Sequence, residues 1–208
     1  MLEKIDFQYD EDITVINQIQ FDEHIQLYEA YIRKYNEIMG IMKAGNSRPE
    51  EANATYSKFR CLKNGQSFAL NAVILHELYF SNIGGGQYAN SIQSSVEDLI
   101  SRDFGSFDNW KLDFIATAKA SRGWAILAYE QRTKCLQNIL LDAHDKGQIV
   151  YSYPLIVLDV YEHAYFIQYG IQKENYINNF LYNINWPIVK KRADALLASC
   201  SHNSEDNQ

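Results

Sequence analysis

The sequence predicts an α+β fold, with an N-terminal helical hairpin followed by a mixed domain that has a three-stranded antiparallel sheet and flanking helices. Three observations predict it. Apolar patterns with the helical period fill much of residues 12–82, short apolar runs of strand length follow between residues 124 and 158, and helical patterns return from about residue 162. We therefore expect an α-hairpin domain at 1–86, an α/β domain at 87–198 and a disordered tail at 199–208.

The hairpin begins with a helix expected from Asp12 to about Met42, where apolar residues recur near the helical period among polar neighbours. Glycine and proline within residues 44–49 end this helix and make a turn. A short helix is expected from Pro49 to Tyr56, and a long one from Ser67 to Asn82. Three glycines at 84–86 break the long helix, so we place the domain boundary there.

The second half combines helical patterns with short apolar runs. Two of these runs flank the polar residues 130–134, which is typical of a β-hairpin, and a third run follows Pro154. In chain order, the expected elements are helices at 90–104 and 107–120, strands at 124–129, 135–141 and 155–158, and helices from about 162 that continue through 175 to 197.

Composition weighs against several classes of protein. Hydrophobic residues make up 47% of the 208 and charged residues 22%, as in globular proteins, and no apolar run is long enough to span a bilayer. The acidic N-terminus lacks the apolar run of a signal peptide, so we expect a cytoplasmic address and no membrane partner. The net charge of −7 disfavours nucleic acid as a partner, because phosphates bind clustered Lys and Arg.

The residues that indicate chemistry begin where the third expected strand ends. Asp159 directly follows the apolar run 155–158, and His163 comes four residues later. A buried carboxylate is costly unless a cation or a donor meets it, and this spacing lets the two side chains converge if a helix begins there. A metal ion would use both groups. The alternative is an aspartate that caps the next helix, with a histidine inside the core, and for an isolated pair this is the commoner arrangement.

The sequence around this pair resembles a known family. The segment Asp159-Val-Tyr-Glu-His-Ala-Tyr165 is similar to the C-terminal signature of the iron/manganese superoxide dismutases, with Tyr161 where that family usually has Trp. Near the front of the chain, His24-Ile-Gln-Leu-Tyr-Glu-Ala-Tyr31 resembles the H-x-x-L-Y-x-G-Y-V form of one divergent branch. The resemblance spans roughly residues 21–192 and includes His76-Glu-Leu-Tyr-Phe-Ser-Asn82, Phe104-Gly-Ser-Phe107 and Arg122-Gly-Trp124.

This resemblance implies an enzyme that converts superoxide to oxygen and hydrogen peroxide by cycling one iron or manganese ion per subunit. Three neutral imidazoles and one carboxylate suit these ions better than an ion that prefers thiolates. The alternative is a relative that keeps the fold as a metal-binding or structural protein with little or no dismutase activity. The metal ligands implied by the resemblance are His24, His76, Asp159 and His163.

Five further residues take roles from the resemblance. Tyr31 matches the tyrosine that gates the substrate channel, and His144 would hydrogen-bond the metal-bound solvent where many members have a glutamine. Trp124 and Tyr161 would wall the site, and Glu162 would bond a ligand histidine of a partner subunit, which implies a homodimer. The alternatives are a core aromatic for Tyr31, a surface histidine for His144 and a solvated helix-start carboxylate for Glu162.

The first helix departs from the commoner family pattern. In the better-known branches the ligand histidine precedes the gate tyrosine by eight residues, whereas His24 precedes Tyr31 by seven, and an ungapped alignment puts Glu23 on the ligand position. One residue rotates a helical side chain by about 100°, so His24 and Glu23 cannot both face the metal. We expect His24 to face it, with the register change absorbed at a helix irregularity.

Other departures concern access to the site. Leu27 and Tyr28 replace a histidine pair and Phe166 replaces a tyrosine, which would break a hydrogen-bonded chain toward the partner subunit. Superoxide is an anion, so its attraction depends on the local field in a cleft and not on the net charge. The candidates for this field are Lys34, Lys173 and Arg33.

Overall fold

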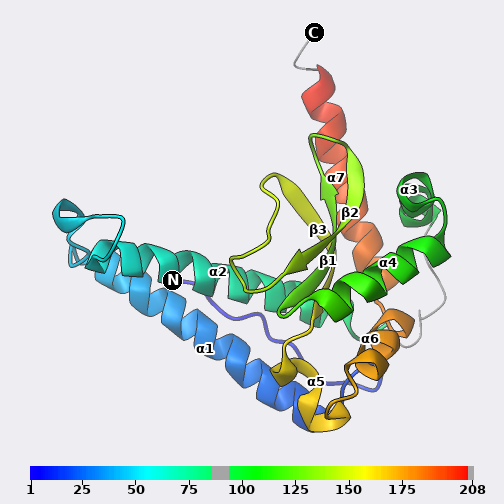
Figure 1. The fold of residues 1–208 in the computed structure, drawn as a ribbon, viewed down its shortest axis with the longest axis horizontal. Helices are drawn as coiled ribbons and strands as arrows, with labels where there is room; N and C mark the ends of the chain where they lie inside the picture. The colour runs from blue at the N-terminus through cyan, green and yellow to red at the C-terminus, as the bar shows by residue number, and fades with distance from the viewer. Residues whose placement is uncertain (86–93, 206–208) are drawn as a thin grey trace.

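The computed structural model of the chain describes residues 1–85 and 94–205. Its first half is a hairpin of two long helices, α1 (Gln18–Lys43) and α2 (Lys58–Asn82), which lie antiparallel and reach out to one side of the molecule (Figure 1). The turn between them carries a short 3-10 helix at Pro49–Glu51. The predicted helical hairpin is therefore confirmed.

Helix α1 starts later than its apolar period predicts. The side chain of Asn17 accepts a hydrogen bond of 2.9 Å from the backbone N–H of Gln20, and this cap begins the helix at Gln18 and not at Asp12. The apolar residues at 13, 15 and 16 are buried in an irregular segment before the helix. These side chains therefore pack into the core although their backbone is not helical.

Helix α2 starts earlier than predicted, and the short helix before it is mostly absent. Ser57 Oγ accepts from the backbone N–H of Arg60 at 3.1 Å, so α2 begins well before Ser67. Within the expected helix at 49–56, the side chain of Asn53 accepts from the backbone N–H groups of Thr55 and Tyr56. These local bonds hold a turn, which competes with helix formation.

The second half surrounds a three-stranded antiparallel sheet with helices, as predicted. The strand order is β2-β1-β3, which makes β1 the central strand, and every residue of β1 is buried. None of the described helices is long and apolar enough to cross a bilayer. In chain order the elements are α3 (Ser94–Phe104), α4 (Phe107–Ala120), β1 (Trp124–Glu130), β2 (Cys135–Leu141), β3 (Ser152–Asp159), α5 (Glu162–Tyr169), α6 (Lys173–Tyr182) and α7 (Trp186–Glu205).

Two boundaries in the second half differ from the prediction. Strand β3 begins at Ser152 and includes Pro154, which is tolerated because β3 lies at the sheet edge and its register with β1 shifts beside that residue. The helices expected after residue 162 are α5, α6 and α7, and Gly170, whose φ is 54°, ends the first of them. Helix α7 runs to Glu205, past the expected start of a disordered tail at 199. The expected helix start at 90 and residues 206–208 lie outside the described residues, and the division into two domains stays a prediction.

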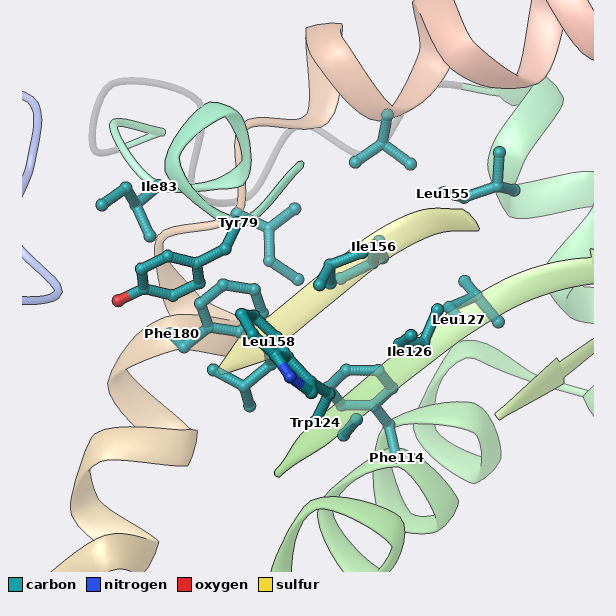
Figure 2. Close-up of a cluster of buried hydrophobic side chains, with 14 of the residues drawn as sticks. Tyr79, Ile83, Phe114, Trp124, Ile126, Leu127, Leu155, Ile156, Leu158 and Phe180 are labelled. Atoms are coloured by element: carbon teal, nitrogen blue, oxygen red, sulfur yellow. The ribbon is translucent and has the colours of Figure 1, made fainter. Parts of the chain in front are cut away.

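The core joins the hairpin to the sheet. Figure 2 shows side chains of β1 and β3 packed with Tyr79 from α2, Phe114 from α4 and Phe180 from α6. At the same junction, the Arg192 guanidinium from α7 donates to the backbone carbonyls of Leu155 (2.7 Å) and Leu78 (3.2 Å). These contacts fix the C-terminal part of α2 against β3, and therefore fix the residues that both elements carry at their shared end.

Candidate metal centre

Four side chains from both halves of the chain meet at one point. Their ligand atoms all lie within 4.8 Å of one another. The side chain of His163 is 32% exposed, whereas the side chains of the other three are fully buried. The cluster consists of His24 on α1, His76 on α2, Asp159 at the end of β3 and His163 in the first turn of α5.

The carboxylate of Asp159 is the centre of this cluster. Its Oδ2 lies 3.2 Å from Nε2 of His24, 3.2 Å from Nε2 of His163 and 3.8 Å from Nε2 of His76. Its Oδ1 accepts from the backbone N–H of Tyr161 at 2.9 Å, which orients the carboxylate at the start of α5. Burial alone would raise the pKa of Asp159, but His163 and His24 outweigh it and hold the pKa below its usual range. The carboxylate is therefore ionised.

His76 presents a lone pair to the same point. Its Nδ1 donates to the backbone carbonyl of Ala72 at 2.6 Å, because a carbonyl oxygen can only accept. Burial, followed by the nearby His24, lowers the pKa of His76 to about 3, so the ring is neutral and Nε2 carries no proton. This buried Nε2 has no hydrogen-bond partner among the described residues, and the same holds for Nδ1 of His24.

These features fit a cation. A buried lone pair without a donor is costly, and a buried carboxylate is stabilised by positive charge close to it. One ion between His76 and Asp159 would pair with the free lone pair of His76 and add to the stabilisation that His24 and His163 already give Asp159. It would leave the Nδ1 bond to Ala72 to orient the ring, as in many metal sites with histidine ligands. Three imidazoles and a carboxylate are ligands that iron and manganese accept.

The structure places His24, and not Glu23, at this centre. His24 is 1% exposed, whereas Glu23 is exposed. The irregularity that we expected in the helix is not found, since α1 is α-helical from Gln18 to Lys43. Seven residues make nearly two full turns of an α-helix, so the short spacing keeps His24 and Tyr31 on one face without a bulge.

A hydrogen-bonded row of three side chains lies beside the cluster. Nε1 of Trp124 donates to Nδ1 of His144 at 3.0 Å, and Nε2 of His144 lies 3.0 Å from the hydroxyl of Tyr31. His144 is 1% exposed, so the alternative of a surface histidine is wrong. The ring centroids of Tyr31 and Trp124 lie 5.6 Å and 5.1 Å from that of His76. Burial lowers the pKa of His144 to about 4.

Other aromatic rings close the site. The ring of Tyr161 stacks on His163 with centroids 5.1 Å apart, and Phe80 lies 5.0 Å from His24. Trp124 and Tyr161 thus lie beside histidines of the cluster, and their role as walls of the site stays a prediction. Glu162 is exposed at the start of α5, and its bond to a partner subunit stays a prediction.

A hollow of about 490 Å³ opens beside His163. Its lining includes a cationic side chain, that of Arg122, which the sequence analysis did not predict. Lys173 lines it and donates to the backbone carbonyl of Ser121 at 2.8 Å, and Arg122 lines it as well. The other two expected cations pair with glutamates, Arg33 with Glu29 and Lys34 with Glu37. The position of Arg122 next to the Gly-Trp124 segment was the signal that could have found it.

The fold and this cluster define a protein built to hold one metal ion with three histidines and an aspartate. Residues 92–192 match the family model of iron/manganese superoxide dismutases, C-terminal domain. The chain is 35% identical to a superoxide dismutase [Fe] of Aquifex pyrophilus over 92% of this chain and 90% of that protein, and 35% identical to one of Aquifex aeolicus over 88% and 86%. A superoxide dismutase [Mn] 1 of Halobacterium salinarum is 28% identical over 78% of each chain. The chain belongs to the iron/manganese superoxide dismutase family.

Proposed function

We propose that this protein is a superoxide dismutase that converts superoxide to oxygen and hydrogen peroxide with one iron or manganese ion. The observation that carries this proposal is the unpaired lone pair of His76, buried next to the ionised Asp159. The family supports the same activity, and its named relatives include enzymes of both metals. When bound, the ion supplies the one-electron chemistry by alternating between two oxidation states.

The residues of this chain then have separate tasks. His24, His76, Asp159 and His163 would hold the ion. The bond that His76 donates to Ala72 and the bond that Asp159 accepts from Tyr161 keep two of these side chains in position. Phe80, Trp124 and Tyr161 exclude bulk water from it, which strengthens electrostatic interactions inside the site. Tyr31 holds a proton on its hydroxyl near the ligands, where the formation of hydrogen peroxide needs one.

Substrate attraction is assigned to the hollow beside His163. Two cations, Arg122 and Lys173, line it beside the most exposed ligand of the cluster, together with one carboxylate, Glu162. Cations in a cleft raise the local concentration of an anion even when the whole protein is acidic. Superoxide, with its single negative charge, is such an anion.

We also infer a homodimer in which Glu162 of one subunit bonds His163 of the other. The partial exposure of the His163 side chain supports it, because this ligand is accessible from the surface at which Glu162 begins α5. Replacing Glu162 with alanine should convert the dimer to a monomer in sedimentation analysis. A variant that stays dimeric would contradict the bridge.

The enzymatic proposal is tested by reconstitution. The purified chain is loaded separately with iron and with manganese, its metal content is measured by elemental analysis, and superoxide consumption is followed for each form. We expect about one ion per chain and catalytic consumption with one metal or both. Bound metal without consumption would support a non-enzymatic relative, and absence of bound metal would overturn the proposal.

A further inference from the structure

The row of Trp124, His144 and Tyr31 fixes the position of a proton. An indole N–H can only donate, so Nδ1 of His144, 3.0 Å from Nε1 of Trp124, must accept and carry no proton. The ring is therefore neutral, and its one N–H is at Nε2. That nitrogen lies 3.0 Å from the hydroxyl oxygen of Tyr31, which accepts from it.

The opposite ring orientation does not satisfy these groups. A half-turn of the His144 ring puts carbon atoms where Nδ1 and Nε2 now lie, and both hydrogen bonds are lost. The indole N–H of Trp124, a residue that is 0% exposed, would then be buried without an acceptor, at a cost of about 1–3 kcal/mol. The ring of Phe68, 4.7 Å from the imidazole, and a 3.4 Å bond from Gln148 to the backbone carbonyl of His144 hold the residue further.

This arrangement has a consequence for Tyr31. Among the described residues, His144 is the only hydrogen-bond partner of the Tyr31 hydroxyl. Because that bond uses the oxygen as acceptor, the hydroxyl keeps its own proton for a group inside the site. We propose that Trp124 locks His144 as the neutral Nε2–H tautomer, so that Tyr31, and not His144, is the side chain of this row that donates a hydrogen bond into the metal site.

The inference changes the role first expected for His144. A glutamine amide has two N–H groups and can donate to a tyrosine and to a second acceptor at once, whereas a neutral imidazole has one. The one N–H of His144 is occupied by Tyr31, so His144 has none left for the metal-bound solvent. His144 is a positioning residue that acts through Tyr31. Only the use of the Tyr31 proton rests on the proposed function. The tautomer of His144 does not.

The tautomer can be measured without a metal. Long-range ¹H–¹⁵N correlation of the full, metal-free chain labelled with ¹⁵N-histidine separates protonated from unprotonated ring nitrogens, and His144→Gln assigns the signals. We expect a protonated Nε2 and an unprotonated Nδ1 at neutral pH. A proton on Nδ1, or on both nitrogens, overturns the inference. Because no metal and no turnover are involved, this outcome is independent of whether the protein is a dismutase.

Two matched variants test the cause. Tyr31→Phe keeps the indole donor and should leave the tautomer unchanged, whereas Trp124→Phe removes that donor and should give a mixture of tautomers. A mixture in Tyr31→Phe would show that Tyr31, and not Trp124, sets the proton, and would overturn the lock. If Trp124→Phe does not fold, the ¹³Cζ shift of Tyr31 decides: it should move in His144→Ala and be restored in His144→Gln. A shift that is unchanged in His144→Ala would show that Tyr31 does not accept from His144.

Discussion

Nδ1 of His76 donates to the backbone carbonyl of Ala72 one helical turn earlier, 2.6 Å away. This bond lies inside α2, so the helix itself selects the tautomer of its own metal ligand. The other nitrogen is left with a lone pair that no described residue satisfies. A local backbone contact thus orients one side chain toward a site whose other three candidate ligands come from other elements.

Removal of this imidazole should remove the ion. Loss of a group that merely orients a ligand lowers metal affinity about 10- to 100-fold, so His76→Ala should lower it at least as much. Metal per chain, measured by elemental analysis after dialysis, checks this. The control is Val73→Ala, a truncation of another buried residue of α2. It should cost stability but retain the metal, and equal loss in both variants would contradict a ligand role.

The register of α1 makes a second prediction. Because Glu23 is exposed and His24 is buried at the cluster, Glu23→Gln should bind the metal like the parent chain, whereas His24→Gln should lose most of it. The same elemental analysis separates the two. Loss of metal in the Glu23 variant would mean that the neighbouring position supplies the ligand.

Arg122 should act on the rate of substrate arrival. At low ionic strength, Arg122→Gln should lower kcat/KM for superoxide about twofold, as expected for one charge acting through water at several ångströms. The difference should vanish near 1 M salt, where the screening length is about 3 Å. Lys34→Gln changes the net charge equally but removes a cation already paired with Glu37. An equal salt-dependent loss in that variant would indicate a net-charge effect and not the hollow.

Asp103 should make folding stability depend on pH. Its carboxylate accepts from the backbone N–H of Leu136 and from Arg102, each at 2.7 Å, and ties α3 to β2. Burial would raise its pKa, but these donors outweigh burial and hold the pKa below its usual value. Because the folded pKa is lower than the unfolded one, the stabilisation is complete above the unfolded pKa and is lost as pH falls through the folded pKa.

Asp103→Asn should therefore lower the free energy of unfolding by about 2 kcal/mol at pH 7, and by much less near pH 3. Urea unfolding of the metal-free chain at both pH values measures this. Asp98→Asn changes an exposed carboxylate of the same helix and should have little effect at either pH. A loss for Asp103→Asn that is the same at both pH values would argue against the ionised carboxylate as its cause.

Arg192 should be a major determinant of stability. Burial lowers the pKa of this guanidinium to about 10, so it remains charged at neutral pH while it bonds the carbonyls of Leu78 and Leu155. Arg192→Met removes this donor from the buried Leu155, whereas the carbonyl of Leu78 keeps the hydroxyl of Ser81 as a donor, and the change should cost about 2 kcal/mol. Thermal unfolding checks this, with the exposed Arg60→Met as control. Equal melting temperatures for the two variants would contradict it.

Local patterns were sufficient where neighbouring residues decide the structure. The alternation of helix and strand elements, and the aspartate at the end of a buried strand four residues before a histidine, were all visible in the order of residues. Asp159 and His163 could be paired because a helix that starts at Glu162 leaves them little freedom. The predicted starts of α1 and α2 were wrong because side-chain caps at Asn17 and Ser57, and not the apolar period, decide where these helices begin.

The amino-acid sequence by itself thus determined the fold class, the family and the four candidate ligands. Only the tertiary structure decided that His24 faces the cluster, that Arg122 lines the hollow, and that His144 lies between Trp124 and Tyr31. The last contact joins residues 113 positions apart. Such a contact depends on how α1 packs against α2 and how α2 packs against β3. The donor and acceptor roles of an imidazole follow from its neighbours in space and not from its neighbours in the chain.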